Sequence, residues 1–73
     1  VPYNAIYDLR LKLPLYTLSK KSRSFYCAGF YLIKYESTWT MEFSPKKIIL
    51  QRNQFLGPYK SESLAKDSLL SLK

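Results

Sequence analysis

The sequence predicts an α+β domain, in which a three- or four-stranded antiparallel sheet carries an N-terminal and a C-terminal helix on one face. Its 73 residues suffice for one domain, and 47% of them are hydrophobic, which favours a folded core. Residues 38–43 alternate polar and apolar side chains, as a strand with one buried face does. Residues 61–72 repeat apolar side chains at helical spacing. We therefore expect residues 1–73 to form a single small domain.

The first predicted element is a short helix from Asn4 to Leu13. Its apolar residues recur at steps of three and four, and Asn4 is suited to the N-cap position. An extended structure over residues 9–15 remains open, because Leu11 and Leu13 alternate with basic residues. Pro14 ends a helix in either case, since proline cannot continue one.

The middle of the chain is predicted to be a sheet. Aromatic, aliphatic and β-branched residues dominate it without a helical period, and polar or Gly-Pro segments interrupt it. Gly29 is expected to mark a bulge or a point of close packing. The predicted strands are residues 15–18, 25–35, 38–43 and 48–56, with breaks at 19–24, 36–37 and 44–47, and Gly57 and Pro58 end the sheet.

The last predicted element is a helix that begins after Ser61 as N-cap. Acidic residues in its early turns suit the positive end of the helix dipole. Its apolar stripe is expected to pack beneath the buried face of residues 38–43, which makes Trp39 a core residue rather than a base-stacking one. The stripe consists of Ala65, Leu69 and Leu72, and the strand face consists of Trp39, Met41 and Phe43.

The charge balance favours a polyanionic partner. Twelve Lys and Arg against five Asp and Glu give a net charge of +7. The densest basic group, Lys20, Lys21 and Arg23, falls in the loop at 19–24, and Lys46 and Lys47 add a second basic turn. A merely solvated surface is the alternative, but two basic loops suit a polyanion that spans several sites.

Residues that commonly carry catalysis or bind metals are scarce. The sequence has no His, only two Gly and a single Cys, so it offers no zinc motif and no Gly-rich phosphate loop. We therefore predict no enzymatic activity and no cofactor. Cys27 lies among aromatic residues and is expected to be a buried, inert thiol.

The sequence also bears on location. No apolar run approaches the length of a membrane span, and no segment has the pattern of a secretory signal. We therefore expect an intracellular protein, cytoplasmic or nuclear, with no membrane partner. The chain begins at Val1 rather than Met, which suggests a domain excised from a longer chain or a processed product.

Both ends of the chain resemble a double-stranded RNA-binding domain. Residues 5–18 resemble its opening, in which a first helix runs into a strand with a Pro-x-Tyr motif, here Pro14 to Tyr16. Residues 61–70 resemble its second helix, whose pattern is Ser-Lys-Lys-x-Ala-Lys. That family has an α-β-β-β-α fold and recognises A-form helices by phosphate and 2′-hydroxyl contacts.

The resemblance implies an RNA-binding surface built from three elements. These are the first helix, the loop between the first strands and the start of the last helix, where backbone amides also favour phosphates. The implied contacts are Asn4, Tyr7 and Arg10, then Lys20, Lys21 and Arg23, then Lys60, Ser63 and Lys66. Glu62 and Ser63 stand where the family has paired lysines.

Two other functions remain open. Residues 29–73 resemble the sheet-plus-helix DNA-binding domains of phage integrases and plant transcription factors, with Arg52, Gln54, Lys34 and Trp39 as candidate base readers. The many aromatic residues and the missing helix lysines fit a domain that binds a protein partner or dimerises. RNA remains the favoured partner.

Overall fold

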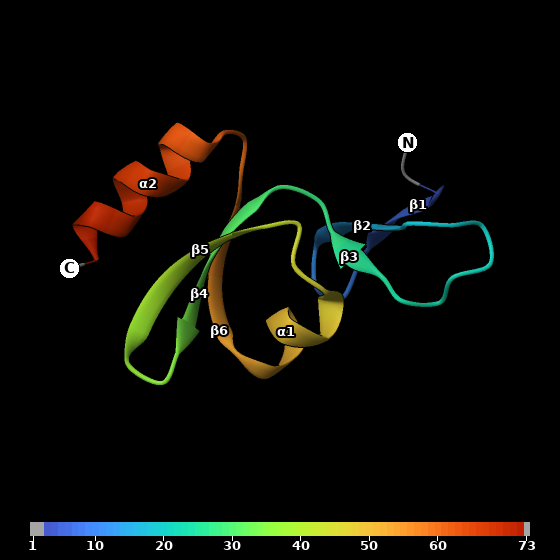
Figure 1. Ribbon diagram of the computed structural model, residues 1–73, viewed down its shortest axis with the longest axis horizontal. Coiled ribbons are helices and arrows are strands. Elements are labelled where there is room, and N and C mark those ends of the chain that lie inside the picture. The colour runs from blue at the N-terminus through green and yellow to red at the C-terminus, as the bar shows by residue number, and fades with distance from the viewer. Residues whose placement is uncertain (1–2, 73) are drawn as a thin grey trace.

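The computed structural model describes residues 3–72 as an elongated α+β fold measuring 40 × 23 × 19 Å (Figure 1). Two antiparallel three-stranded sheets have the strand orders β1-β2-β3 and β5-β4-β6. The α+β class is as predicted. The elements are β1 (Tyr3–Asp8), β2 (Leu13–Thr17), β3 (Tyr26–Cys27), β4 (Phe30–Tyr35), β5 (Thr38–Phe43), α1 (Lys47–Arg52), β6 (Gln54–Tyr59) and α2 (Glu62–Ser71).

The predicted N-terminal helix is wrong, because residues 3–8 form the strand β1. The alternation of Leu13 and Leu15, which are both buried in β2, outweighs the helical spacing that precedes it. β1 pairs with β2 in an antiparallel hairpin. The turn between them is held by the Asp8 carboxylate, which accepts hydrogen bonds from the backbone N–H groups of Arg10 and Leu11, both at 2.9 Å.

The predicted long strand at 25–35 is divided between the two sheets. β3 pairs with β2, whereas β4 is the central strand of the second sheet. Gly29 lies at the division with a φ of +111°, a conformation that residues with a Cβ rarely adopt. A Cβ at Gly29 would also lie 3.1 Å from the Cβ of Pro58. The expectation that Gly29 marks close packing is thus confirmed.

The predicted strand at 48–56 is wrong in its first half. Residues 47–52 form the short helix α1, which buries Leu50. Periodicity cannot separate a strand from a buried helix over so few apolar residues. The Asn53 side chain ends α1 by donating a hydrogen bond to the Ile49 carbonyl at 2.9 Å. Gly57 and Pro58 do not end the sheet, because β6 continues to Tyr59, which pairs with Phe30 of β4.

The main core lies between the N-terminal sheet, α1 and one face of β4. Tyr31 and Ile33 of β4 are buried there together with Leu50 of α1, and the N-terminal sheet contributes Leu13, Leu15 and Cys27. Leu32 alternates with Tyr31 and Ile33, so it points to the opposite face, where α2 packs. The two helices therefore lie on opposite faces of β4, which corrects the prediction of a single covered face.

The last helix begins as predicted. The Ser61 hydroxyl accepts a hydrogen bond from the backbone N–H of Leu64 at 3.2 Å. α2 contacts β4, β5 and β6. No helix within residues 3–72 is both long and apolar enough to span a membrane.

The predicted contact between α2 and β5 is smaller than expected. Ala65 is fully buried, Leu69 is half-buried and Leu72 is exposed. On β5, Trp39 and Met41 are half-buried, whereas Phe43 is 67% exposed. Trp39 and Phe43 are therefore not core residues. β5 is an edge strand, so these side chains have cross-strand neighbours on one side only.

Candidate functional site

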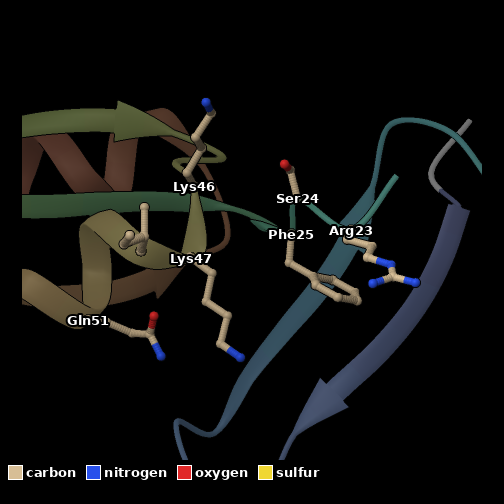
Figure 2. A pocket seen from close by; sticks show the side chains of 7 residues that line it. Arg23, Ser24, Phe25, Lys46, Lys47 and Gln51 are labelled. Atoms are coloured by element: carbon tan, nitrogen blue, oxygen red, sulfur yellow. The ribbon is translucent and has the colours of Figure 1, made fainter. Parts of the chain in front are cut away.

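A cavity of about 400 Å³ lies where the segment before β3 meets α1 (Figure 2). Arg23, Ser24 and Phe25 line one side of it. The other side is formed by Lys46, which precedes α1, and by three residues of α1, which are Lys47, Ile48 and Gln51. None of these lining residues is acidic. The cavity is therefore lined by three cations, Arg23, Lys46 and Lys47, which belong to the two separate basic segments noted in the sequence.

A smaller cavity of about 190 Å³ continues along α1. Its lining consists of Asp8, Arg10, Leu11, Lys47 and Gln51. The two cavities adjoin, because Lys47 and Gln51 line both. We call the two cavities together the basic cleft.

The backbone holds the two sides of the basic cleft together. The N–H of Lys47 donates to the carbonyl of Phe25 at 2.9 Å, and the N–H of Cys27 donates to the carbonyl of Pro45 at 2.8 Å. An antiparallel bridge joins Tyr26 to Lys46. These bonds fix residues 25–27 against residues 45–47, so the two basic segments stay close without the help of a ligand.

An ion pair lies at the point where the two cavities meet. The Lys47 ammonium is 3.2 Å from the Asp8 carboxylate. The pKa of Asp8 is lowered mainly by the hydrogen bond from the Leu11 backbone N–H, with smaller contributions from Lys47 and the Arg10 N–H, while partial desolvation opposes them. Asp8 therefore stays ionised at neutral pH and holds Lys47. The other cations that line the basic cleft are Arg10, Arg23 and Lys46.

Phe25 supplies an aromatic wall. It is half-buried and packs against the main core, so its ring is held in place. In Figure 2 the ring lies between the side chains of Lys47 and Arg23, and Lys46 points away from Lys47. The cavity thus combines an apolar surface with cations at its margin.

The remaining basic residues of the β2–β3 loop are exposed and line neither cavity. Lys20 and Lys21 precede Arg23 in this loop. Asn4 anchors the start of the loop, because its side-chain amide donates to the Lys20 carbonyl at 3.1 Å and to the Thr17 hydroxyl at 2.9 Å. Asn4 therefore positions the loop, and both of its side-chain hydrogens are already used.

The predicted contacts at α2 lie elsewhere. Lys60, Ser63 and Lys66 are exposed near the start of α2, which packs on the second sheet. Figure 1 shows α2 at the opposite end of the molecule from the β2–β3 loop. Lys66 also forms an ion pair with Glu62 at 2.8 Å, which raises the pKa of Lys66. The structure therefore does not bring this group to the cleft.

The other predicted contacts are divided between the cleft and the open surface. Arg10 lines the smaller cavity from the β1–β2 turn, whereas Tyr7 is 57% exposed on β1 and lines neither cavity. Of the candidate DNA readers, Lys34 lies with its ammonium 5.9 Å from the centre of the Trp39 ring. Gln54 is opposite Lys34 in the sheet, and Arg52 ends α1.

Sequence reasoning missed Phe25, Ile48 and Gln51. Phe25 was placed in a long strand, and residues 48–56 were expected to be extended. The four-residue spacing of Lys47 and Gln51, which puts them on one face of a helix, was the available signal for their shared position. The contact of residues 25–27 with residues 45–47 has no such local signal.

Cys27 takes no part in the basic cleft. It is fully buried in the main core, and this burial raises the pKa of its thiol to about 11. Residues 3–72 contain no group of three His, Cys, Asp or Glu side chains placed to hold a metal ion.

The basic cleft thus combines cations from three segments of the chain with the aromatic ring of Phe25 and the side-chain amide of Gln51. The chain matches no protein-family model, no curated protein and no solved structure.

Proposed function

We propose that the chain is a non-catalytic nucleic-acid-binding domain that holds a phosphate backbone in the basic cleft. The observation that carries this proposal is the convergence of Arg10, Arg23 and Lys46 from three separate segments on adjoining cavities. Guanidinium and ammonium groups are the usual partners of phosphate oxygens. Three such groups on adjoining cavities suit a chain of phosphates better than a single small anion.

The rest of the molecule supports a polymeric partner. The net charge of +7 favours polyanions, and the exposed Lys20 and Lys21 add two cations to the loop that also carries Arg23. Because residues 3–8 form a strand rather than the first helix of a double-stranded RNA-binding domain, the resemblance that remains is that of residues 61–70 to the second helix of the family, and it favours RNA. Binding through the cleft and its loop needs no contribution from Lys60, Ser63 and Lys66.

The groups in the basic cleft favour binding over catalysis. The Asp8 carboxylate already accepts hydrogen bonds from the β1–β2 turn and forms an ion pair with Lys47. Gln51 does not titrate. The guanidinium, ammonium and amide groups of the basic cleft are suited to holding an anionic ligand by hydrogen bonds.

Removing two cations of the larger cavity is expected to weaken binding and reduce its salt dependence. In the double variant Arg23→Gln and Lys46→Gln, each lost phosphate contact should lower the slope of log affinity against log salt by about 0.7 to 0.9. The expected total change is about 1.5. Fluorescence anisotropy with labelled duplex RNA, duplex DNA and single strands, at several salt concentrations, measures this slope.

A variant with the same charge change at α2 serves as the matched control. Lys60→Gln with Lys66→Gln also removes two charges, but at the end of the molecule distant from the cleft. We expect its salt slope to stay close to that of the unmodified protein. Equal losses from both double variants would contradict the cleft as the binding surface. Binding of duplex DNA alone would favour the integrase-like alternative.

A second candidate function is self-association through β1. This strand is an edge of its sheet, and Ile6 and Tyr7 are 52% and 57% exposed on it. Exposed edges with apolar side chains can pair with another strand. Sedimentation equilibrium would support this function by a concentration-dependent dimer that Ile6→Lys abolishes, and a monomer at every concentration would exclude it.

A further inference from the structure

We infer that the larger cavity of the basic cleft takes an unpaired nucleotide, with its base against Phe25 and its phosphates at Arg23 and Lys46. This inference rests on the proposed function and goes further, because it names single-stranded rather than duplex nucleic acid as the ligand of that cavity. Its basis is the mixed lining of the cavity, where apolar and amide groups lie among the cations.

The size of the cavity fits one nucleotide. Its volume of about 400 Å³ lies in the range of small-molecule sites, which runs from about 300 to 1,000 Å³. The backbone of a duplex contacts a protein from the outside of the double helix, whereas a base of a single strand can leave the backbone and occupy a cavity of this volume.

The walls of the cavity suit a base. Phe25 is held by the main core and presents its ring to the cavity, and Ile48 adds a second apolar side chain that is 46% exposed. A base that stacks on an aromatic ring gains affinity whatever its identity, because every base has a π face. The Gln51 amide, which faces the same cavity, offers both a donor and an acceptor for a base edge.

Lys47 lines the cavity but is not counted among the phosphate contacts. Its ammonium is occupied by Asp8 at 3.2 Å. The cations left for the phosphates on either side of the inserted base are Arg23 and Lys46, which come from opposite sides of the cavity. In a duplex, the bases are paired and stacked inside the helix, so none can reach Phe25. A single strand can place an unpaired base against Phe25 and its phosphates at Arg23 and Lys46.

The first test uses the unmodified protein. Its affinity is measured by anisotropy for a labelled single-stranded RNA, for the same strand carrying abasic positions, and for the duplex of the same length. We expect the intact single strand to bind most tightly, and the abasic strand to lose about 5- to 150-fold in affinity, the range for one stacked base. The salt slope should be the same for the intact and abasic strands, because the phosphates are unchanged.

A protein variant tests the aromatic wall. Phe25→Leu should lower affinity for the intact strand without changing the salt slope or the affinity for the duplex, whereas Phe25→Tyr should retain tight binding. Circular dichroism checks that both variants are folded. Equal affinity for the intact and abasic strands, with the salt slope still reduced in the Arg23 and Lys46 variant, would overturn the base cavity and leave the proposed function standing. Absence of salt-dependent binding to every oligonucleotide would overturn both.

Discussion

Replacing Leu15 with Ala is expected to leave most of the protein unfolded at room temperature. Leu15 lies in β2, is only 2% exposed and belongs to the main core, which β4 and α1 also line. Truncating a buried Leu costs about 2 to 5 kcal/mol, because apolar contact is lost and a cavity remains. The total stability of a domain of this size is only a few kcal/mol, so one such loss is decisive. Urea denaturation followed by circular dichroism measures the change.

Leu18→Ala provides the matched control for this prediction. Leu18 directly follows β2 but is 62% exposed, so the same truncation should change the free energy of unfolding by less than about 1 kcal/mol. Similar denaturation curves for the two variants would mean that the N-terminal sheet does not share a core with the second sheet. In that case the contact of the N-terminal sheet with α1, on which the basic cleft depends, would lose its structural basis.

Replacing Gly57 with Ala is the second change for which we expect a large loss of stability. Gly57 lies in β6 with a φ of +128°, which side chains with a Cβ rarely adopt. A Cβ at this position would lie 2.9 Å from the Phe30 carbonyl oxygen and 2.9 Å from Cδ2 of the buried Tyr31 ring. Neither group is free to move. We expect a loss of about 2 to 4 kcal/mol from backbone strain and overpacking together.

Gly29→Ala gives a graded comparison. Gly29 has a similar φ of +111°, but its added Cβ would meet the Cβ of Pro58 at 3.1 Å rather than a backbone oxygen. Its free energy of unfolding should therefore fall by less than that of Gly57→Ala. Thermal melts of both variants test the order. A Gly57 variant as stable as the unmodified protein would show that β6 does not approach β4 as closely as described.

Local patterns in the sequence were sufficient for part of the fold. The alternation at 38–43 predicted β5, and Ser61 predicted the start of α2, because each signal depends only on nearby residues. The helix predicted for residues 4–13 was wrong, because a short segment with helical spacing can still form a strand when it pairs with a neighbouring strand. Whether these residues form a helix or a strand depends on their pairing with β2, and the burial of β2 cannot be inferred from the nearby residues alone.

The basic residues of the candidate site could be predicted from the sequence, but their arrangement in space could not. The basic pairs around Arg23 and Lys46 were evident from their density. Their convergence depends on hydrogen bonds between residues 25–27 and residues 45–47, which are distant in sequence. The helix α1 was also needed to place Gln51 beside Lys47. Contacts of this kind arise from tertiary packing, which overrides local preference.

The central claim is that the basic cleft binds nucleic acid, and backbone amide shifts measured during an oligonucleotide titration test it most directly. A ¹H–¹⁵N spectrum of this 73-residue chain, recorded with increasing single-stranded RNA, reports each backbone N–H separately. We predict that the largest shifts fall within residues 20–25 and 46–51 and at Arg10, and that those of α2 stay small. Shifts concentrated on α2, or spread evenly over both sheets, would contradict the claim.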